Sequence, residues 1–136
     1  MALPQTEYWS SPVRYVLFPL VDEAWWSSQS KAEMGENVAA FGSYQAALKE
    51  AGVFVGAYRP EPSSAAKTVR IADGKAVVRD GPQASAKEQL GGIYILNVPD
   101  LDAALSWAAR NPAANYGVVE VRPLGSPPPN SSLTSS

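Results

Sequence analysis

The sequence predicts an α+β domain, because segments typical of β-strands alternate with two amphipathic helices in one chain of 136 residues. A strand is expected at 13–21, which is rich in branched and aromatic residues. The helix that follows should begin after Ser30, since Ser30 and Glu33 have the spacing of a capping box, and should end at Gly52. A second strand is expected at 53–58.

A β-hairpin is expected to interrupt this order. Residues 68–72 and 75–79 form two short alternating runs separated by Asp73 and Gly74. Asp-Gly between such runs favours a two-residue turn, because both central residues of that turn need positive φ. The hairpin is therefore predicted as an insertion between two strands of the main sheet.

The second half of the chain is expected to repeat the strand–helix–strand order. The most apolar strand is predicted at 92–98, and Asp100 should cap the next helix. Its inner face should carry Leu101, Ala104, Leu105 and Ala108. With a closing strand at 117–122, the order matches the split βαβ plan of ferredoxin-like domains, in which two helices cover one face of an antiparallel sheet.

The central strands are apolar on both faces. In the strand at 92–98, isoleucines alternate with Tyr94 and Leu96. An antiparallel sheet normally presents a polar second face to water. A second copy that lays its sheet over this face would explain the pattern, so a homodimer is expected.

Both ends of the chain are expected to lie outside the folded unit, which should span 13–124. Residues 1–12 mix Pro, Ser and polar residues, and 125–136 form a Pro/Ser-rich tail that cannot bury enough apolar surface to order itself. The first twelve residues lack both a basic start and an apolar stretch, so no secretory signal is expected and the cytoplasm is the predicted location.

Composition excludes several classes of site. The chain has no Cys and no His, which removes disulfides, thiolate nucleophiles, Cys-based zinc sites and His-ligated haem. No metal and no cofactor are expected, and acid–base chemistry must use Asp, Glu, Lys or Tyr. The 11 basic residues do not cluster, so no nucleic acid is expected as a partner. No run of about 20 apolar residues predicts a membrane span.

Five short motifs follow one another along the second half of the chain. They are Thr68-Val69-Arg70, Asp73-Gly74-Lys75, Asp80-Gly81-Pro82, the run KEQLGG at 87–92, and Glu120-Val121-Arg122-Pro123. In order and spacing they resemble the YCII-related proteins of the DGPF type, with a weaker match that extends upstream to Val13. The resemblance implies a dimeric α/β barrel, in which two sheets face each other around a cavity.

The resemblance implies little about activity. Most members have no assigned reaction, one relative is described as a dehydrochlorinase of hydroxylated aromatics, and some members are encoded beside alternative sigma factors. Two departures matter here. Gln83 stands where the motif normally has Phe, and the His that forms half of a proposed His–Asp pair in certain members is missing. Only the Asp half, at Asp80, can be transferred.

Asp80 is the predicted catalytic residue. Its carboxylate follows a strand and can act as a general acid or base at the mouth of a cavity. A turn explains the same residues equally well, because Asp accepts backbone N–H bonds, Gly81 permits positive φ and Pro82 fixes the exit. Both interpretations stay open at this point.

Other charged residues are candidate ligand-binding groups. Lys87 can hold an anionic or enolate oxygen while Glu88 orders the loop, although adjacent opposite charges are usually just solvated. Strand alternation puts Glu120 and Arg122 on one face, which is the dimer cavity if the neighbouring valines meet the helices. There Arg122 either pairs with a carboxylate of the protein or binds one from a ligand, and Arg70 on the hairpin is a further candidate.

Trp25 and Trp26 are expected in a loop between the first strand and the first helix, where adjacent Trp residues often rim a pocket. The leading hypothesis is a small-molecule-binding dimer with a cofactor-free lyase or isomerase activity on a small cyclic or aromatic compound. One rival is a cofactor-free oxygenase of the antibiotic-biosynthesis type, by analogy of fold with proteins that use Trp, Tyr and Asn, here Asn97. The other is a non-enzymatic accessory or sensor protein linked to transcriptional regulation.

Overall fold

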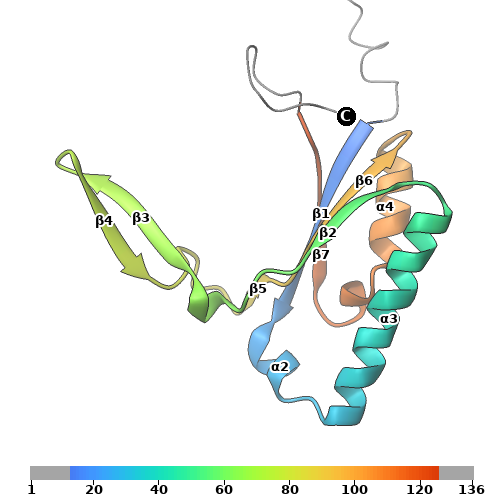
Figure 1. Ribbon diagram of the computed structural model, residues 1–136, viewed down its shortest axis with the longest axis horizontal. Helices are drawn as coiled ribbons and strands as arrows, with labels where there is room; N and C mark the ends of the chain where they lie inside the picture. The colour runs from blue at the N-terminus through green and yellow to red at the C-terminus, as the bar shows by residue number, and fades with distance from the viewer. Residues whose placement is uncertain (1–12, 126–136) are drawn as a thin grey trace, which may run out of the picture.

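The computed structural model describes residues 13–125, so the expected N-terminal extension and residues 126–136 of the Pro/Ser-rich tail lie outside the described residues. The elements are, in chain order, β1 (Val13–Asp22), α2 (Glu23–Ser27), α3 (Lys31–Glu50), β2 (Phe54–Tyr58), the 3₁₀ turn η1 (Ser63–Ala65), β3 (Lys67–Ala72), β4 (Lys75–Asp80), β5 (Glu88–Leu90), β6 (Ile93–Val98), α4 (Leu101–Arg110), the 3₁₀ turn η2 (Pro112–Asn115) and β7 (Val118–Pro123). The predicted α+β class is confirmed (Figure 1).

The main sheet is antiparallel and is built around β1, the first and longest strand. β6 pairs with one edge of β1, β7 pairs with the other edge, and β2 pairs with the free edge of β6. The strand order β2-β6-β1-β7 is compatible with a ferredoxin-like α+β fold.

The segment before Gly91, expected as a solvated loop, is instead the short strand β5. It pairs with Leu20–Asp22, at the end of β1. The Gly91 N–H donates to the Pro19 carbonyl at 2.8 Å, which keeps the chain against β1 between β5 and β6. A Cβ at Gly91 would lie 2.9 Å from Val21 Cγ2, so any larger residue here would have to displace the Val21 side chain.

The helices α3 and α4 lie on the same face of the sheet (Figure 1). The predicted capping box at the start of α3 is confirmed: Ser30 Oγ accepts the Glu33 N–H at 3.1 Å, and Glu33 Oε1 accepts the Ser30 N–H at 2.9 Å. The sheet and the two helices enclose the hydrophobic core. Its buried members are Tyr15, Leu17, Tyr44, Leu48, Tyr94, Leu96, Val98, Ala104 and Ala108.

The predicted inner face of α4 is correct for two of its four residues and wrong for the other two. Ala104 and Ala108 are buried, but Leu101 and Leu105 are exposed on the side of the helix. Trp107 packs against the core instead, so the buried stripe is rotated away from the two leucines. Small residues at the contact allow α4 to approach the sheet closely.

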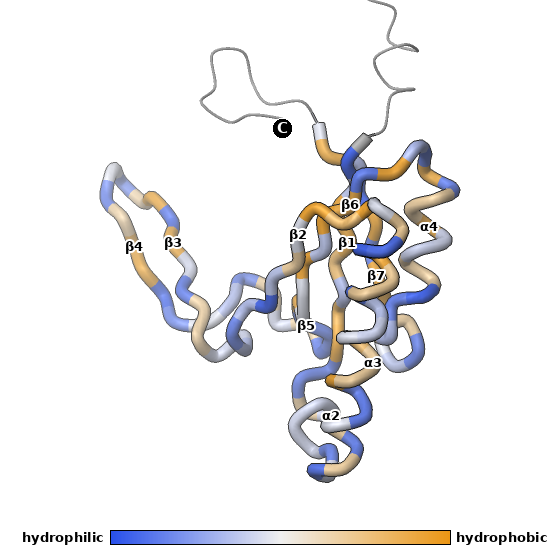
Figure 2. Tube along the Cα trace, turned by 45° about the vertical axis from the view of Figure 1, so that its right-hand side comes forward, coloured by the Kyte–Doolittle hydropathy of each residue, from blue (hydrophilic) through white to orange (hydrophobic). Residues whose placement is uncertain are grey.

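The opposite face of the sheet, which we call the open face, carries no helix. Its apolar side chains are Val16, Phe18, Leu20, Ile93, Ile95 and Val118. Figure 2 shows that the main-sheet strands are rich in hydrophobic residues. Both faces of the central strands are therefore apolar, while α3 and α4 cover only one of them.

The strands β3 and β4 form a separate two-stranded antiparallel sheet, which we call the arm. Asp73 and Gly74 connect the strands with φ of 51° and 75°. The arm projects away from the rest of the described chain, which we call the body (Figure 1). Of its strand residues only Thr68 is partly covered.

No helix within residues 13–125 is long and apolar enough to span a membrane.

Candidate functional site

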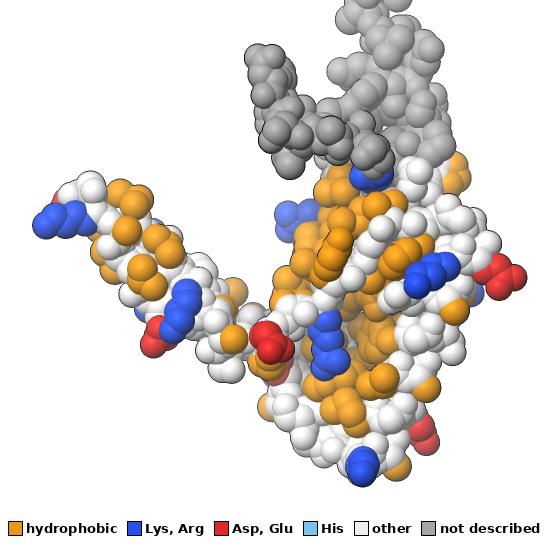
Figure 3. Space-filling model, in the orientation of Figure 1, with side chains coloured by type: hydrophobic (Ala, Val, Ile, Leu, Met, Phe, Trp, Pro, Cys, Tyr) orange, Lys and Arg blue, Asp and Glu red, His pale blue; other side chains and the backbone are white. Residues whose placement is uncertain are grey.

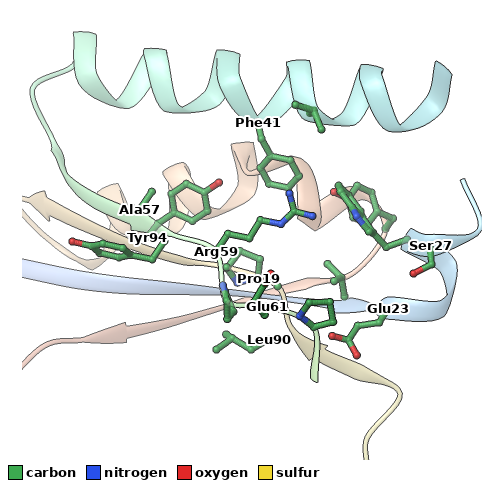
Figure 4. A pocket seen from close by; sticks show the side chains of 18 of the residues that line it. Pro19, Glu23, Ser27, Phe41, Ala57, Arg59, Glu61, Leu90 and Tyr94 are labelled. Carbon is green, nitrogen blue, oxygen red and sulfur yellow. The ribbon is translucent and has the colours of Figure 1, made fainter. Parts of the chain in front are cut away.

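A cavity of about 640 Å³, which we call the cleft, lies on the helix-covered side of the sheet. Figure 3 shows an apolar hollow between the sheet and α3, and Figure 4 shows the side chains that line it. The walls come from α2, α3, the end of β2 and the loop after it, and the floor comes from β1 and β6. The lining includes Glu23, Trp26, Val38, Phe41, Arg59, Glu61, Tyr94 and Tyr116.

The short helix α2 closes one end of the cleft. Trp25 and Trp26 were predicted in a loop, which is wrong, because both lie on α2. Asp22 caps this helix: its Oδ1 accepts the N–H groups of Ala24 at 3.0 Å and of Trp25 at 3.3 Å. The cap turns the chain sharply at the end of β1 and places Trp26, but not Trp25, along the cleft.

Tyr116 joins the aromatic residues of this end into one cluster. Its ring centroid lies 4.5 Å from that of Trp25 and 6.1 Å from that of Trp26, and Trp26 lies edge-on to Phe41 at 6.3 Å. The Tyr116 hydroxyl is buried with no hydrogen-bond partner among the described residues. Burial raises the pKa of Tyr116 to about 12, and burial also raises the pKa of Tyr94, so both phenols stay neutral at physiological pH.

Arg59 places a cation in this largely apolar cleft. Its guanidinium carbon lies 5.6 Å from the centre of the Trp26 ring. In Figure 4 the side chain runs beneath Phe41 into the cavity. No carboxylate of the described residues lies within ion-pair distance of it.

Glu23 ties α2 to the loop that leads into the arm. Its carboxylate accepts the Ser63 N–H at 2.8 Å and also the Ser63 hydroxyl. Both carboxylate oxygens therefore have donors from η1. This link fixes the rim of the cleft relative to the base of the arm.

A second, more open hollow, which we call the side pocket, lies on the other side of Tyr116. Lys87, Glu88 and Trp25, three of the predicted ligand-binding residues, line it together. Lys87 Nζ lies 3.5 Å from Asp22 Oδ2, so the charge predicted to bind a ligand oxygen is near a carboxylate of the protein.

The remaining predicted site residues lie away from both cavities. Asp80 is at the end of β4, where its exposed carboxylate accepts from Lys67 Nζ at 2.5 Å, and Arg70 is exposed on β3. Gln83 accepts from Arg79 at 2.9 Å, beside the base of the arm.

Arg122 lies on the open face of the sheet. Val119 and Val121 pack against the core, as the strand alternation predicted, so Glu120 and Arg122 point the other way. Arg122 Nη2 and Glu120 Oε2 form an ion pair at 2.7 Å.

Asn97 is exposed, whereas its neighbours Leu96 and Val98 are buried against the helices. The Trp, Tyr and Asn of the oxygenase hypothesis therefore do not meet in the cleft of one copy.

Sequence reasoning missed the residues that shape the cleft. Phe41, Arg59 and Tyr116 come from a helix, a strand end and a turn that are distant in the chain, so no local motif connects them. The one available signal was a basic residue between a strand and a Pro-rich loop, at Arg59. Within residues 13–125, no three acidic side chains gather closely enough to hold a metal ion.

Two comparisons with known proteins identify the family. The model of the YCII-related domain matches residues 23–125. An uncharacterized protein of Rhizobium meliloti (strain 1021) is 38% identical over 112 residues, which cover 81% of this chain and 90% of that protein. The chain therefore belongs to the YCII-related domain family.

Proposed function

We propose that this protein binds a small, flat and largely apolar molecule in the cleft. The observation that carries the proposal is the lining: Trp26, Phe41 and Tyr94 border a volume of about 640 Å³ beside a single cation. Small-molecule sites have volumes of roughly 300–1,000 Å³ and combine an apolar lining with a few polar groups. The cleft fits this description, and a hydroxylated or carboxylated aromatic compound is a ligand of suitable size.

The test is a titration with 2-naphthol, followed by calorimetry, on a pair of tryptophan variants. Val38 lines the cleft and is exposed, so Val38→Trp should fill the cavity without disturbing the core and should weaken binding at least about fivefold. Ala39→Trp adds the same ring at the next, exposed position of α3, which is not part of the lining, and should bind as the wild type does. Equal binding by both variants would place the probe elsewhere and reject the proposal.

We further propose that two copies pair through their open faces. Support comes from the apolar side chains there, most of which are only partly buried, because an apolar sheet face without a helix over it is a typical interaction surface. Sedimentation equilibrium should give twice the 14.4 kDa mass of the chain at tens of micromolar.

The matched variants for this test are Ile95→Lys on the open face and Leu105→Lys on the outer side of α4. The first should yield a folded monomer, and the second should remain a dimer. A wild-type monomer at these concentrations would refute the pairing.

The chemistry that we propose for the cleft is a cofactor-free lyase or isomerase step. Asp80 remains the proposed proton-transfer group, with Lys87 as an electrostatic partner. Because Asp80 is on the projecting arm, this role requires the arm of a second copy to approach the cleft. Binding without turnover, as in an accessory or sensor protein, is the outcome expected if that approach does not occur.

A further inference from the structure

We propose that the cleft selects aromatic anions, such as arene carboxylates, and that the Arg59 guanidinium binds the anionic group. This inference rests on the proposed binding function and adds the chemical class of the ligand. It is carried by the geometry and surroundings of Arg59.

First, no carboxylate of the described residues compensates the charge of Arg59. Lys67, Lys87 and Arg122 each lie within 4.0 Å of a carboxylate oxygen. Arg59, an exposed residue, has no such partner among the described residues. Other exposed cations such as Arg70 and Arg110 also lack one, but Arg59 borders an apolar cavity. A cation beside apolar walls is stabilised by an incoming anion more strongly than a fully solvated cation is, because the local dielectric is lower.

Second, the side chain of Arg59 is oriented by an aromatic ring. Trp26 lies 5.6 Å from the guanidinium carbon, and this contact favours a defined position of the planar group. A guanidinium presents N–H donors in a fixed fork that matches the two oxygens of a carboxylate. The aromatic body of the ligand can then pack against Phe41, beneath which Arg59 extends in Figure 4.

Third, the acidic groups of the lining do not oppose an anion at Arg59. Both carboxylate oxygens of Glu23 accept from Ser63, so this carboxylate is already held by donors of the protein. Glu61 is an exposed residue of the rim. Tyr94 and Tyr116 are neutral, because burial raises the pKa of both phenols.

The experiment compares 2-naphthoate with 2-naphthamide, which have nearly the same shape and differ in charge. Calorimetric titrations on the full chain should show the carboxylate binding about 10- to 100-fold more tightly, as expected for a charge-assisted pair of hydrogen bonds. Arg59→Met should remove this preference while leaving the affinity for 2-naphthamide within about threefold of the wild type. Arg59→Lys keeps the charge but loses the fork, so it should retain only part of the preference.

Arg110→Met is the matched control. Arg110 also lies over a tryptophan, with its guanidinium carbon 4.2 Å from the Trp107 ring, but it is on α4 and is not part of the cleft lining. This variant should bind both probes as the wild type does.

The outcomes separate the two levels of the proposal. Equal affinities of the wild type for the two probes, or a preference that survives Arg59→Met, would overturn the anion selectivity and leave the cleft as a binding site. Failure of the wild type to bind either probe would overturn the binding function and the selectivity together.

Discussion

The body and the arm are made of the same type of antiparallel strand, yet they bury their side chains in opposite ways. Leu17 and Leu96 of the main sheet are completely buried beneath the helices. On the arm, Val69, Ile71 and Val78 are between 61% and 67% exposed, although they have equally apolar side chains. Apolar strand residues alone therefore do not determine burial, which depends on an element that covers the strand.

The two sides of the arm also differ from each other. Directly paired residues share a face, so Val69, Val78, Ile71 and Ala76 form an apolar side. Arg70, Arg79 and Lys75 lie on the opposite side. A lone two-stranded sheet is at best marginally stable in water, so the apolar side is the surface that a second copy would most stabilise. The body contains the cleft within one copy, whereas no strand residue of the arm lines it.

The largest loss of stability is expected from Gly117→Ala in the body. A Cβ at Gly117 would lie 2.2 Å from the Leu20 carbonyl oxygen, a backbone atom that cannot move without breaking the β1–β7 pairing. We expect a loss of about 3 kcal/mol or more in the free energy of unfolding, measured by urea denaturation.

Gly42→Ala is the control for that substitution. Nothing lies within 4 Å of the new Cβ on α3, so this change should stabilise the protein by about 0.5–1 kcal/mol. Similar effects of the two substitutions would show that β7 does not approach β1 as closely as described.

A pair of tyrosines in the body should respond differently to the loss of a hydroxyl. The Tyr44 hydroxyl donates to the Trp107 carbonyl at 2.8 Å, so Tyr44→Phe should lower the free energy of unfolding by about 1–2 kcal/mol. The Tyr116 hydroxyl has no partner among the described residues, so Tyr116→Phe should be neutral or stabilising by up to about 1 kcal/mol.

The same pair predicts how the stability of the body depends on alkaline pH. Burial raises the pKa of Tyr116 to about 12 and also raises that of Tyr44, so the folded state holds these protons more tightly than the unfolded state. Their contribution is complete below pH 10 and is lost as the pH rises through the folded-state values. Tyr116→Phe should reduce the loss of stability between about pH 10 and 12, and an unchanged slope would mean that this phenol is solvated.

Excision of the arm should change the stability of the body less than Gly117→Ala or Tyr44→Phe does. The Gly81 N–H donates to the Ala66 carbonyl at 2.8 Å, so the two ends of the arm are already adjacent. Replacing 67–80 with two glycines should leave the helix content and the thermal midpoint of the body within a few degrees, because the arm adds nothing to the core. Loss of cooperative unfolding would show that the arm supports the body.

The contrast between body and arm also explains how much the sequence could predict. Ser30 with Glu33, and Asp73 with Gly74, carry their structural signal within four residues, so the start of α3 and the connection between β3 and β4 could be placed from local chemistry. The five-residue helix α2 is too short to show a helical period, and its Trp pair was therefore assigned to a loop.

The candidate site could not be predicted in the same way. Arg59 follows β2 and Tyr116 precedes β7, two strands of one sheet that are distant in the chain, so their position at one cavity has no local signature. Asp80, the predicted catalytic residue, lies instead on the arm. Motif order thus identified the family better than it identified the cavity.

The smallest effect on stability is expected from a substitution at Asp80. This substitution tests directly whether only the body, and not the arm, contributes to ligand binding. The side chains of Asp80 and Lys67 are 87% and 62% exposed, so their 2.5 Å ion pair is screened by water and contributes little to folding. Asp80→Asn should change the free energy of unfolding by less than about 0.5 kcal/mol and should leave the affinity for 2-naphthoate unchanged. Urea denaturation and calorimetry on the same preparation measure both quantities.

Weaker binding at unchanged stability would mean that the arm contributes to a cleft. Because Asp80 is on the arm, that cleft would belong to the second copy, and mixing Asp80→Asn with Arg59→Met should then restore tight binding at one site per dimer. Unchanged binding would instead leave the whole ligand site in the body.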